Sequence, residues 1–419
     1  MRRLYPLLLL AACGGDDGPP PCDDTRVGGI CTIAGDGKNG YAGDEGPALE
    51  ARMSLPQDTL HAPDGTMYIL DWNNHRIRGV SADGVIHHVA GRGELGGTLD
   101  DPANADLNHP TGIVLDPSGA HLVIAAWHNS KIRELDLGTG EIADSCGDGR
   151  RAYFGDDGPA LTASLDLPAS IAYDPRGDLI VMDQANQVLR RIDAAGMIHR
   201  YAGRCVIEAP PPLGTGPCAP GVDPTPCPAP SGKWTCGGLA TCSTPCTPGY
   251  GGDEAVATDM RIAQPFGQAA DPAGRIVFDA AGNLYFADSS NALIRKIDAG
   301  SGVVHRIAGI APANNLPQTG YAGDGGPATE AKLNNPVDLA LAEDGTLYVT
   351  DVYNHCVRAI APDQTIRTVA GTCTQPGYAG DGGLATAATL KRPYGLELAG
   401  DFLYISDTGN NVIRAVRLR

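Results

Sequence analysis

The sequence has few aromatic residues, fewer basic than acidic residues and, beyond its first twelve positions, no long apolar run. Phe, Trp and Tyr make up 5% of the 419 residues, and 49 Asp and Glu against 31 Lys and Arg give a formal net charge of −18. Proteins that bind nucleic acid or anionic lipid need a basic surface, so this balance argues against both partners. No glycine-rich loop precedes a helix and no nucleophile stands at a recognisable spacing from a base, so common catalytic motifs are missing too.

The amino-terminal segment has the pattern of an export signal. A short basic start is followed by an apolar stretch that is too short to remain in a bilayer, which predicts a signal peptide over residues 1–12. Leu10-Ala11-Ala12-Cys13 resembles the lipobox of bacterial lipoproteins, which implies cleavage before Cys13 and lipidation of its thiol. Residues 13–29 are rich in Gly, Asp and Pro and predict a tether rather than a buried strand. Gly14 favours an outer-membrane destination by the usual bacterial sorting pattern.

One eight-residue motif organises the rest of the chain. It runs from Asp to Arg with Asn at its fourth position in nearly every copy, and it occurs at 71–78, 126–133, 183–190, 288–295, 351–358 and 407–414. Each copy follows a short run rich in β-branched and aromatic residues, and a further strand-like run after it commonly ends in Ala-Gly. With a Pro-led apolar segment upstream, each unit of about 56 residues holds four short strands, which is the pattern of a propeller blade.

The two ends of the repeat array predict how the ring closes. The sixth unit ends at Arg419 without a fourth strand, whereas residues 30–35 have the pattern of a fourth strand with no unit in front of them. We expect residues 30–35 to complete the last blade, because closure removes unpaired strand edges. The predicted fold is an all-β, six-bladed β-propeller over residues 30–419.

Twelve cysteines indicate an oxidising compartment. Six of them lie in a Pro-rich insert at 204–250, which interrupts the repeat after the third blade, and disulfides are expected there. Zinc is the alternative, since Cys242 and Cys246 have a ligand-like spacing. Cys356 and Cys373 could form a further bridge. Cys22 and Cys31 could do likewise, which would leave Cys146 unpaired.

The motif itself resembles the NHL repeat, whose name-giving dipeptide is present as Asn74-His75 and Asn354-His355. Loops of the form Tyr-Ala-Gly-Asp-Gly-Gly-Pro-Ala precede several units, as at 321–328, and resemble those of teneurin-type NHL propellers. This resemblance implies the propeller fold but no single activity, because NHL propellers include protein-binding modules, RNA-binding modules and enzymes. The second unit departs from the pattern, with Ala126 in place of Asp.

Loops on a rigid scaffold are where binding residues are usually placed. We expect the Gly-rich loops and the Asp-x-x-Asn turns to surround the central channel on one face. The loops carry repeated carboxylates that could bind Ca²⁺ or a cationic ligand, although repetition in nearly every blade favours a purely structural role for them. These carboxylates are Asp44, Glu45, Asp156, Asp157, Asp253, Glu254, Asp324 and Asp381.

Residues that do not repeat are better site candidates. The second position after the Pro of each first strand should lie at the channel mouth. It is occupied by Asp58, Gly112, Ser170, Asp338 and Gly395 in five blades, and the irregular fourth blade offers Arg275 close to this position. Asp58 and Asp338 could share a cation, or Arg275 could neutralise Asp338. His109 is the only histidine at such a strand start, whereas His75, His128 and His355 belong to the turns and are expected to be inert.

Two functions fit these observations. The first is a monomeric, lipid-anchored binding module at the cell envelope, which engages a protein, peptide or glycan through its loop-rich face. The second is a metal-dependent enzyme similar to the NHL-type amidating lyase or to six-bladed lactonases, with Ca²⁺ or Zn²⁺ in the channel. No catalytic acid and base pair is evident and no resident cofactor is predicted, so the sequence favours the binding module.

Overall fold

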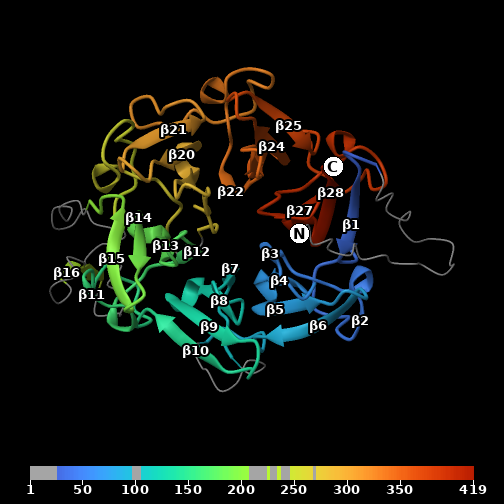
Figure 1. The fold of residues 1–419 in the computed structure, drawn as a ribbon, viewed down its shortest axis with the longest axis horizontal. Helices are drawn as coiled ribbons and strands as arrows, with labels where there is room; N and C mark the ends of the chain where they lie inside the picture. Colours follow the sequence, from blue (N-terminus) through green and yellow to red (C-terminus); the bar gives the residue numbers. More distant parts are fainter. Residues whose placement is uncertain (1–25, 97–104, 207–223, 227–233, 237–245, 268–269) are drawn as a thin grey trace.

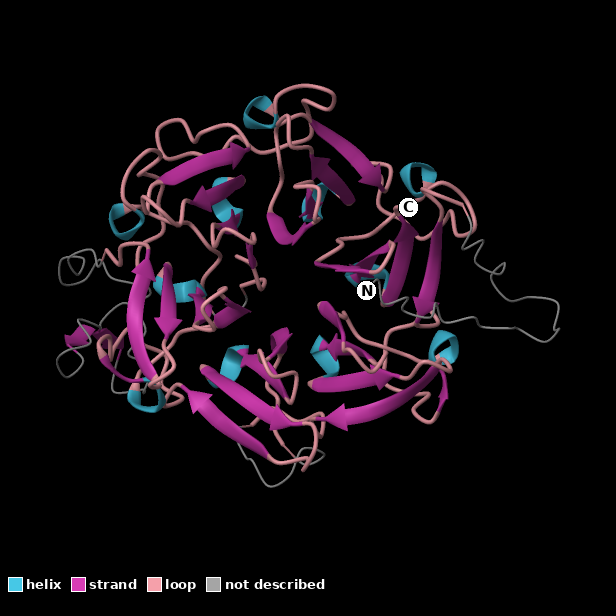
Figure 2. Ribbon diagram, in the orientation of Figure 1, coloured by secondary structure: helices cyan, strands magenta, loops and turns pink. Residues whose placement is uncertain are grey.

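The computed structural model describes residues 26–96, 105–206, 246–267 and 270–419, together with the backbone of 224–226 and 234–236. These residues form six antiparallel sheets that stand as blades around one axis, as Figures 1 and 2 show. The six-bladed propeller predicted from the repeats is therefore confirmed. The signal peptide, Cys13 and most of the tether lie outside the described residues.

In each blade the strands run outwards from the axis in chain order. Blade 1 contains β3 (Asp58–His61), β4 (Met67–Asp71), β5 (Arg76–Val80) and β6 (Val85–Ala90), with β2 (Gly46–Pro47) on its outer edge. Blade 2 contains β7 (Pro110–Leu115), β8 (His121–Ala126), β9 (Lys131–Asp136) and β10 (Ile142–Cys146). Blade 3 contains β12 (Pro168–Tyr173), β13 (Leu179–Asp183), β14 (Val188–Ile192) and β15 (Met197–Ala202), edged by β11 (Gly158–Pro159).

Blade 4 contains β18 (Ile276–Phe278), β19 (Leu284–Asp288), β20 (Leu293–Ile297) and β21 (Val304–Ala308). Blade 5 contains β22 (Pro336–Leu341), β23 (Leu347–Asp351), β24 (Cys356–Ile360) and β25 (Ile366–Ala370). Blade 6 contains β26 (Gly395–Ala399), β27 (Phe402–Asp407), β28 (Val412–Arg417) and β1 (Ile30–Ala34). In the insert between blades 3 and 4, β16 (Pro224–Pro226) pairs with β17 (Trp234–Cys236).

The ring closes through β1, as the sequence predicted. This strand pairs antiparallel with β28, and Ile30 lies opposite Val416. The first described strand of the chain thus forms the outer strand of the blade made by the last three strands. Closure leaves no blade with an open outer position at the junction of the two ends.

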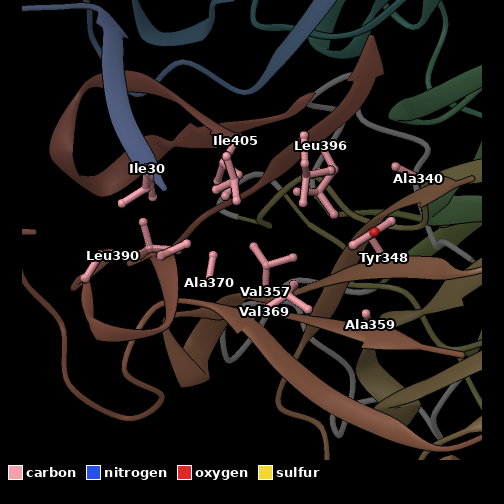
Figure 3. Close-up of a cluster of buried hydrophobic side chains, with 14 residues drawn as sticks. Ile30, Ala340, Tyr348, Val357, Ala359, Val369, Ala370, Leu390, Leu396 and Ile405 are labelled. Carbon is pink, nitrogen blue, oxygen red and sulfur yellow. The ribbon is translucent and has the colours of Figure 1, made fainter. Parts of the chain in front are cut away.

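The core consists of apolar layers between neighbouring blades. Figure 3 shows one layer, in which Leu396 and Ile405 of blade 6 face Val357 and Val369 of blade 5, with Ile30 of β1 at the edge. Branched aliphatic side chains and alanines fill the space between the stacked sheets, which explains why so few aromatic residues are needed.

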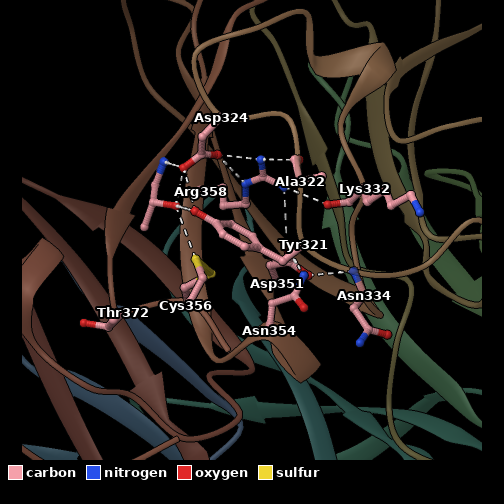
Figure 4. The surroundings of a disulfide bond; sticks show 12 residues. Tyr321, Ala322, Asp324, Lys332, Asn334, Asp351, Asn354, Cys356, Arg358 and Thr372 are labelled. Carbon is pink, nitrogen blue, oxygen red and sulfur yellow. Dashed lines mark hydrogen bonds and ion pairs between the residues drawn. A yellow bond between two sulfur atoms is a disulfide. The ribbon is translucent and has the colours of Figure 1, made fainter. Parts of the chain in front are cut away.

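The repeated motif forms a one-turn 3-10 helix between the second and third strands of each blade. In blade 5, Asp351 accepts hydrogen bonds from the backbone N–H of Asn334 (2.7 Å) and from Asn354 Nδ2 (2.8 Å). The fully buried Arg358 donates to Asp324 of the preceding Gly-rich loop (2.5 Å) and lies 3.6 Å from Asp351 (Figure 4). Blades 1, 3 and 6 repeat this arrangement, which confirms that the Asp and Arg of the motif hold the fold.

These turns are η2 (Trp72–Asn74), η3 (Trp127–Asn129), η5 (Gln184–Asn186), η7 (Ser289–Asn291), η9 (Val352–Asn354) and η11 (Thr408–Asn410). The residue after each one has a left-handed backbone with φ between 54° and 60°. We call the side of the propeller that carries these turns the turn face.

In blades 1, 3, 5 and 6, the residue after the turn also links the blade to the next. His75 Nδ1 accepts a hydrogen bond from the backbone N–H of His109 (3.2 Å), and His355 Nδ1 accepts one from Arg392 (3.1 Å). Asn411 and Gln187 use their side-chain carbonyl oxygens in the same way. The position therefore tolerates His, Asn or Gln because each presents an acceptor to the backbone of the following blade.

Blade 2 lacks the motif carboxylate and holds its arginine through a different acid, at the nitrogen that bonds the Gly-rich-loop acid in blades 1, 3, 5 and 6. Ala126 stands where the other blades have Asp, and the buried Arg133 pairs instead with Asp144 of the outer strand (3.0 Å). Asn129 Oδ1 accepts the backbone N–H of Asn108 (2.9 Å), a bond that the Asp receives in other blades. Asn129 thus takes over the backbone contact that Ala126 cannot make, and Asp144 holds the motif arginine.

Disulfides appear where the sequence allowed them. Cys356 at the start of β24 is bonded to Cys373 beyond β25, and Cys205 is bonded to Cys246 at the base of the insert. Because Cys246 is bonded to Cys205, its sulfur is not free to bind the zinc ion that was the alternative to disulfides. Cys242 lies outside the described residues. Cys31 is disulfide-bonded, and Cys22, its expected partner, is also outside them. Cys146 is free and buried as predicted, and burial raises the pKa of its thiol to about 12.

Candidate functional site

Three of the predicted site residues meet at the propeller axis. Arg275, which directly precedes β18, donates from Nη1 to Asp58 Oδ2 at 2.6 Å, and its Nη2 donates to the backbone carbonyl of Thr111. One guanidinium thus joins blades 1, 2 and 4. Asp338 of blade 5 accepts the backbone N–H groups of Leu339 (2.7 Å) and Leu396 (2.9 Å) and does not contact Arg275 directly.

The positive charge of Arg275 lies close to both axial carboxylates, Asp58 and Asp338. Burial lowers the pKa of Arg275, but the neighbouring Asp58 and Asp338 carboxylates raise it overall and keep the guanidinium charged. Burial raises the pKa of Asp58 to about 7, although Arg275 acts to lower it. Burial likewise raises the pKa of Asp338. Arg275 pairs directly with Asp58, and its charge also acts on Asp338, whose pKa it lowers against the effect of burial.

Small residues allow the axial strands to approach closely. A methyl group at Gly112 would lie 3.1 Å from Arg275 Nη1, and one at Gly395 would lie 2.4 Å from the carbonyl oxygen of Gln57. Ser170 is buried and its Oγ accepts the backbone N–H of Ile276 (3.2 Å). These predicted channel-mouth positions therefore serve the packing of the inner strands.

His109 lies in an aromatic cluster that the sequence did not predict. Its ring is 4.2 Å from that of His75, 4.7 Å from that of His128 and 4.5 Å from that of Trp72, centre to centre. His128 in turn stacks on Trp127 at 4.2 Å. The histidines of two turns and of one strand start are thus brought together at the junction of blades 1 and 2.

Burial keeps these imidazoles neutral. It lowers the pKa of His109 to about 3 and that of His128 to about 4, helped by the charge of nearby histidines and, for His128, of Arg151. Burial also lowers the pKa of His75, whose Nδ1 must be unprotonated to accept its backbone hydrogen bond. The described residues contain no group of three or more His, Cys, Asp or Glu side chains arranged to hold a metal ion.

The Gly-rich loops do not surround the channel, and that prediction is wrong. Each loop begins beside a turn, as Gly40 shows by accepting Asn74 Nδ2, but it then runs outwards. In blade 1, Gly46 and Pro47 pair with the outermost strand β6. The loops lead into the 3-10 helices at the circumference (Figure 2), which are η1 (Ala48–Glu50), η4 (Ala160–Thr162), η6 (Ala257–Asp259), η8 (Ala328–Glu330) and η10 (Ala385–Ala387).

The loop carboxylates mostly hold side chains of their own blade. The first acid of each loop pairs with the motif arginine, as Asp44 does with Arg78 and Asp253 with Arg295 (3.0 Å). A loop tyrosine also donates its hydroxyl to this acid, at 3.0 Å in the case of Tyr321 and Asp324. These contacts support the structural role that repetition suggested.

The turn face carries a set of contacts, made by the segment before β18, that the sequence did not predict. Residues 265–267 and 270–274, the described parts of the long segment before β18, contact the turns of other blades. Gln184 Nε2 donates to the carbonyls of Pro265 (2.8 Å) and Asp271 (3.0 Å), and Ala270 packs against the Trp72 and Trp127 cluster. The only sequence signal was the irregular spacing in the fourth unit, which does not indicate where the extra residues fold.

Asp271 of this segment meets residues of blades 5 and 6. Its Oδ2 accepts hydrogen bonds from the Tyr353 hydroxyl (2.7 Å) and from Arg392 Nη2 (2.8 Å). Arg392 lies between two aromatic rings, 5.4 Å from that of Tyr353 and 5.5 Å from that of Tyr394. Its Nη2 also donates to the Tyr394 hydroxyl (2.7 Å). Side chains from three blades thus converge beside the channel mouth.

A groove of about 350 Å³ lies elsewhere, between the outer parts of blades 1 and 2. Tyr68, His87, His88 and Leu137 are among its lining residues, and none of the predicted axial residues lines it. In the described part of the chain, no helix is long and apolar enough to cross a membrane.

The fold and the turn geometry define a six-bladed β-propeller with a repeated Asp-x-x-Asn turn. The family model for the NHL repeat matches residues 333–360, which span the end of the Gly-rich loop segment and β22 to β24 of blade 5. The chain is an NHL-repeat β-propeller, as its motif indicated.

Curated relatives agree with this assignment. Mouse Teneurin-1 is 25% identical over 398 residues, which cover 80% of this chain and 13% of that protein. The chloroplastic protein SUPPRESSOR OF QUENCHING 1 of Arabidopsis thaliana is 32% identical over 152 residues, or 36% of this chain and 14% of its own. The chain therefore spans about a seventh of the length of these relatives.

A solved structure from Bacteroides thetaiotaomicron shares the fold. It is described as an auxiliary nutrient binding protein, and it matches with a TM-score of 0.58 and 14% identity over 92% of this chain and 75% of its own.

Proposed function

We propose that this propeller is a non-catalytic binding module that engages a protein, peptide or glycan through its turn face, and that Cys13 anchors it to the cell envelope. One observation carries the proposal. Arg275 and Asp58 are paired in a buried contact at the axis, and Asp338 is held by backbone N–H groups. The turn face, in contrast, carries three partly exposed side chains that do not repeat from blade to blade: Phe266, Tyr353 and Arg392. Exposed aromatic and Arg side chains are the types enriched in binding surfaces.

The irregular fourth blade supports a specific rather than a general role for this face. Among the described residues, the segment before β18, at 265–267 and 270–274, is longer than the strand starts of blades 1, 3, 5 and 6, and Phe266 in it is 50% exposed. Phe266 follows Pro265, whose carbonyl is held by Gln184, and aromatic side chains are among the types enriched in binding surfaces. The Bacteroides propeller described as nutrient binding gives a fold-level parallel and no more.

The experiment is a binding screen with two matched surface variants. Purified protein comprising residues 14–419 is applied to peptide and glycan arrays beside Phe266→Ala and Leu161→Ala. Leu161 on the circumference is 55% exposed, so it controls for loss of an equally exposed apolar side chain. We expect signals that Phe266→Ala weakens at least tenfold and Leu161→Ala leaves unchanged. Signals that respond only to Leu161→Ala would overturn the turn-face proposal.

Lipid anchoring has its own test. Metabolic labelling with a clickable fatty acid should mark the full chain in a bacterial host, and Cys13→Ser should abolish the label. A labelled Cys13→Ser protein would contradict attachment at this thiol.

A further inference from the structure

The contact between Asp271 and Arg392 joins elements that are far apart in the chain. Asp271 lies before the first strand of blade 4, whereas Tyr353 belongs to the turn of blade 5 and Arg392 precedes the first strand of blade 6. Both charged side chains are partly exposed, at 34% for Asp271 and 41% for Arg392. An ion pair in such a position is worth little to stability, at most about 1 kcal/mol. The contact therefore adds little to folding stability, and its geometry instead suggests a site that recognises a ligand.

We call three side chains the donor cluster: Arg392, Tyr353 and Tyr394. Two of them, Arg392 and Tyr353, donate hydrogen bonds to the same carboxylate oxygen. Asp271 Oδ2 receives both the Tyr353 hydroxyl and Arg392 Nη2. Burial and the hydrogen bond to Asp271 raise the pKa of Tyr353 to about 12, so this hydroxyl is a donor at neutral pH. Tyr394 is 2% exposed, and its ring and hydroxyl fix the guanidinium from the other side.

Asp271 leaves one hydrogen-bond donor of the donor cluster without an acceptor. Arg392 Nε is buried and has no hydrogen-bond partner among the described residues. A guanidinium binds a carboxylate best with two parallel hydrogen bonds, commonly from Nε and one Nη nitrogen, and Asp271 provides an acceptor for only one of them. A carboxylate that approached along both nitrogens would satisfy a buried donor that the internal one does not reach.

The donor cluster lies beside basic side chains, although the protein as a whole is acidic. Lys391 is exposed next to Arg392, so two adjacent basic residues lie at the channel mouth of a chain with net charge −18. Among the described residues, Asp271 is the only acid that forms an ion pair with either basic side chain, and from these two residues Asp407 accepts only the backbone N–H of Lys391. A local positive site on an acidic protein favours an anionic group of a ligand over a cationic one.

We propose that Arg392, Tyr353 and Tyr394 form a carboxylate-binding site, and that Asp271 occupies it until a carboxylate of the partner displaces it. The site lies on the turn face and thus rests on the function proposed above. It assigns a chemical class to the ligand: a carboxylate, carried either by a small molecule or by the free carboxyl terminus of a peptide. The displaced Asp271 returns to solvent with its segment, and the incoming group takes over both donors.

The test removes the internal carboxylate without changing its shape. Asp271→Asn in the 14–419 protein should bind sodium benzoate at least tenfold more tightly than the unsubstituted protein, measured by isothermal titration calorimetry. Benzamide, the neutral analogue, should not gain affinity. The peptide Gly-Gly-Phe with a free or an amidated carboxyl terminus separates the two sources, because only a site open to chain ends would also prefer the free peptide.

Two further variants keep the result interpretable. Asp401→Asn removes an exposed carboxylate from the hairpin between β26 and β27 and should leave benzoate affinity unchanged, which controls for net charge. Arg392→Lys in the Asp271→Asn background keeps the charge but not the paired donors and should lose most of the gain. Equal benzoate affinity with and without Asp271→Asn, in protein with an unchanged urea midpoint, would overturn the proposal. If array binding at Phe266 persisted in that case, only the carboxylate site would fall and the turn-face function would stand.

Discussion

Replacement of Arg275 by methionine tests whether the axial cluster is structural. Arg275→Met leaves Asp58, with 8% of its side chain exposed, without its 2.6 Å partner. Removing one member of a buried ion pair costs about 3–5 kcal/mol, because the remaining charge is uncompensated. We expect a loss of this size at pH 8, measured as a lower urea midpoint by tryptophan fluorescence.

The cost should depend on pH in a definite direction. Burial raises the pKa of Asp58 to about 7, above its ordinary value of 3.8, so the folded state binds a proton more tightly than the unfolded state. The stability linked to this proton is complete in acid and is lost as pH rises through about 7. Since Arg275 lowers this pKa, the variant should go on losing stability above pH 7, where the unsubstituted protein levels off.

At pH 5 the Asp58 carboxyl is mostly protonated in both proteins, and the remaining cost is the hydrogen bond to the Thr111 carbonyl and lost packing, about 1–2 kcal/mol. Asp58→Asn combined with Arg275→Met should recover part of the loss at pH 8. A penalty that is the same at pH 5 and pH 8, or below about 0.5 kcal/mol at both, would refute this account of the axis.

The remaining predictions concern the turns, blade 2, the disulfide and the axial metal hypothesis. His75→Ala should lower the free energy of unfolding by about 1 kcal/mol through the lost bond to His109, whereas His75→Asn should retain stability because Asn411 fills this role in blade 6; equal losses would contradict the link between blades. Asp144→Ala should destabilise blade 2 by about 3–5 kcal/mol, and Ala126→Asp added to it should restore part of the loss; no recovery would show that the two carboxylates are not equivalent. Cys356→Ser with Cys373→Ser, which opens a loop closed over 17 positions, should cost about 3 kcal/mol in thermal unfolding, an effect absent under reducing conditions. Elemental analysis of protein purified without chelator should find less than one equivalent of Zn²⁺ or Ca²⁺, and a full equivalent lost in Asp58→Ala would favour the enzyme alternative.

The fold was accessible from the sequence because its main determinants are local and repeated. The apolar runs before each Asp-x-x-Asn turn and the spare strand at residues 30–35 sufficed to predict the blades and the closure through β1. Compensation across two strands was not accessible. Nothing in the second unit alone indicates that Asp144 holds Arg133, or that Asn129 takes the backbone bond that Ala126 cannot make.

The site was predicted only in part, because it depends on contacts between distant blades. Asp58 and Arg275 were identified from their position after the strand start, but their pairing across the axis needed the ring geometry. The Gly-rich loops were misplaced, since their sequence does not show whether they stay near the axis or run to the outer strand. Asp271, Tyr353 and Arg392 went unnoticed because each is unremarkable in its own segment.

Photo-crosslinking in intact cells that produce the protein tests the central claim most directly. A benzoylphenylalanine residue is placed on the turn face at Phe266 or on the circumference at Leu161, two positions of similar exposure. The binding-module account predicts a discrete adduct from Phe266 and none from Leu161. An adduct from Leu161 alone, or none from either position while the arrays also show no binding, would contradict it.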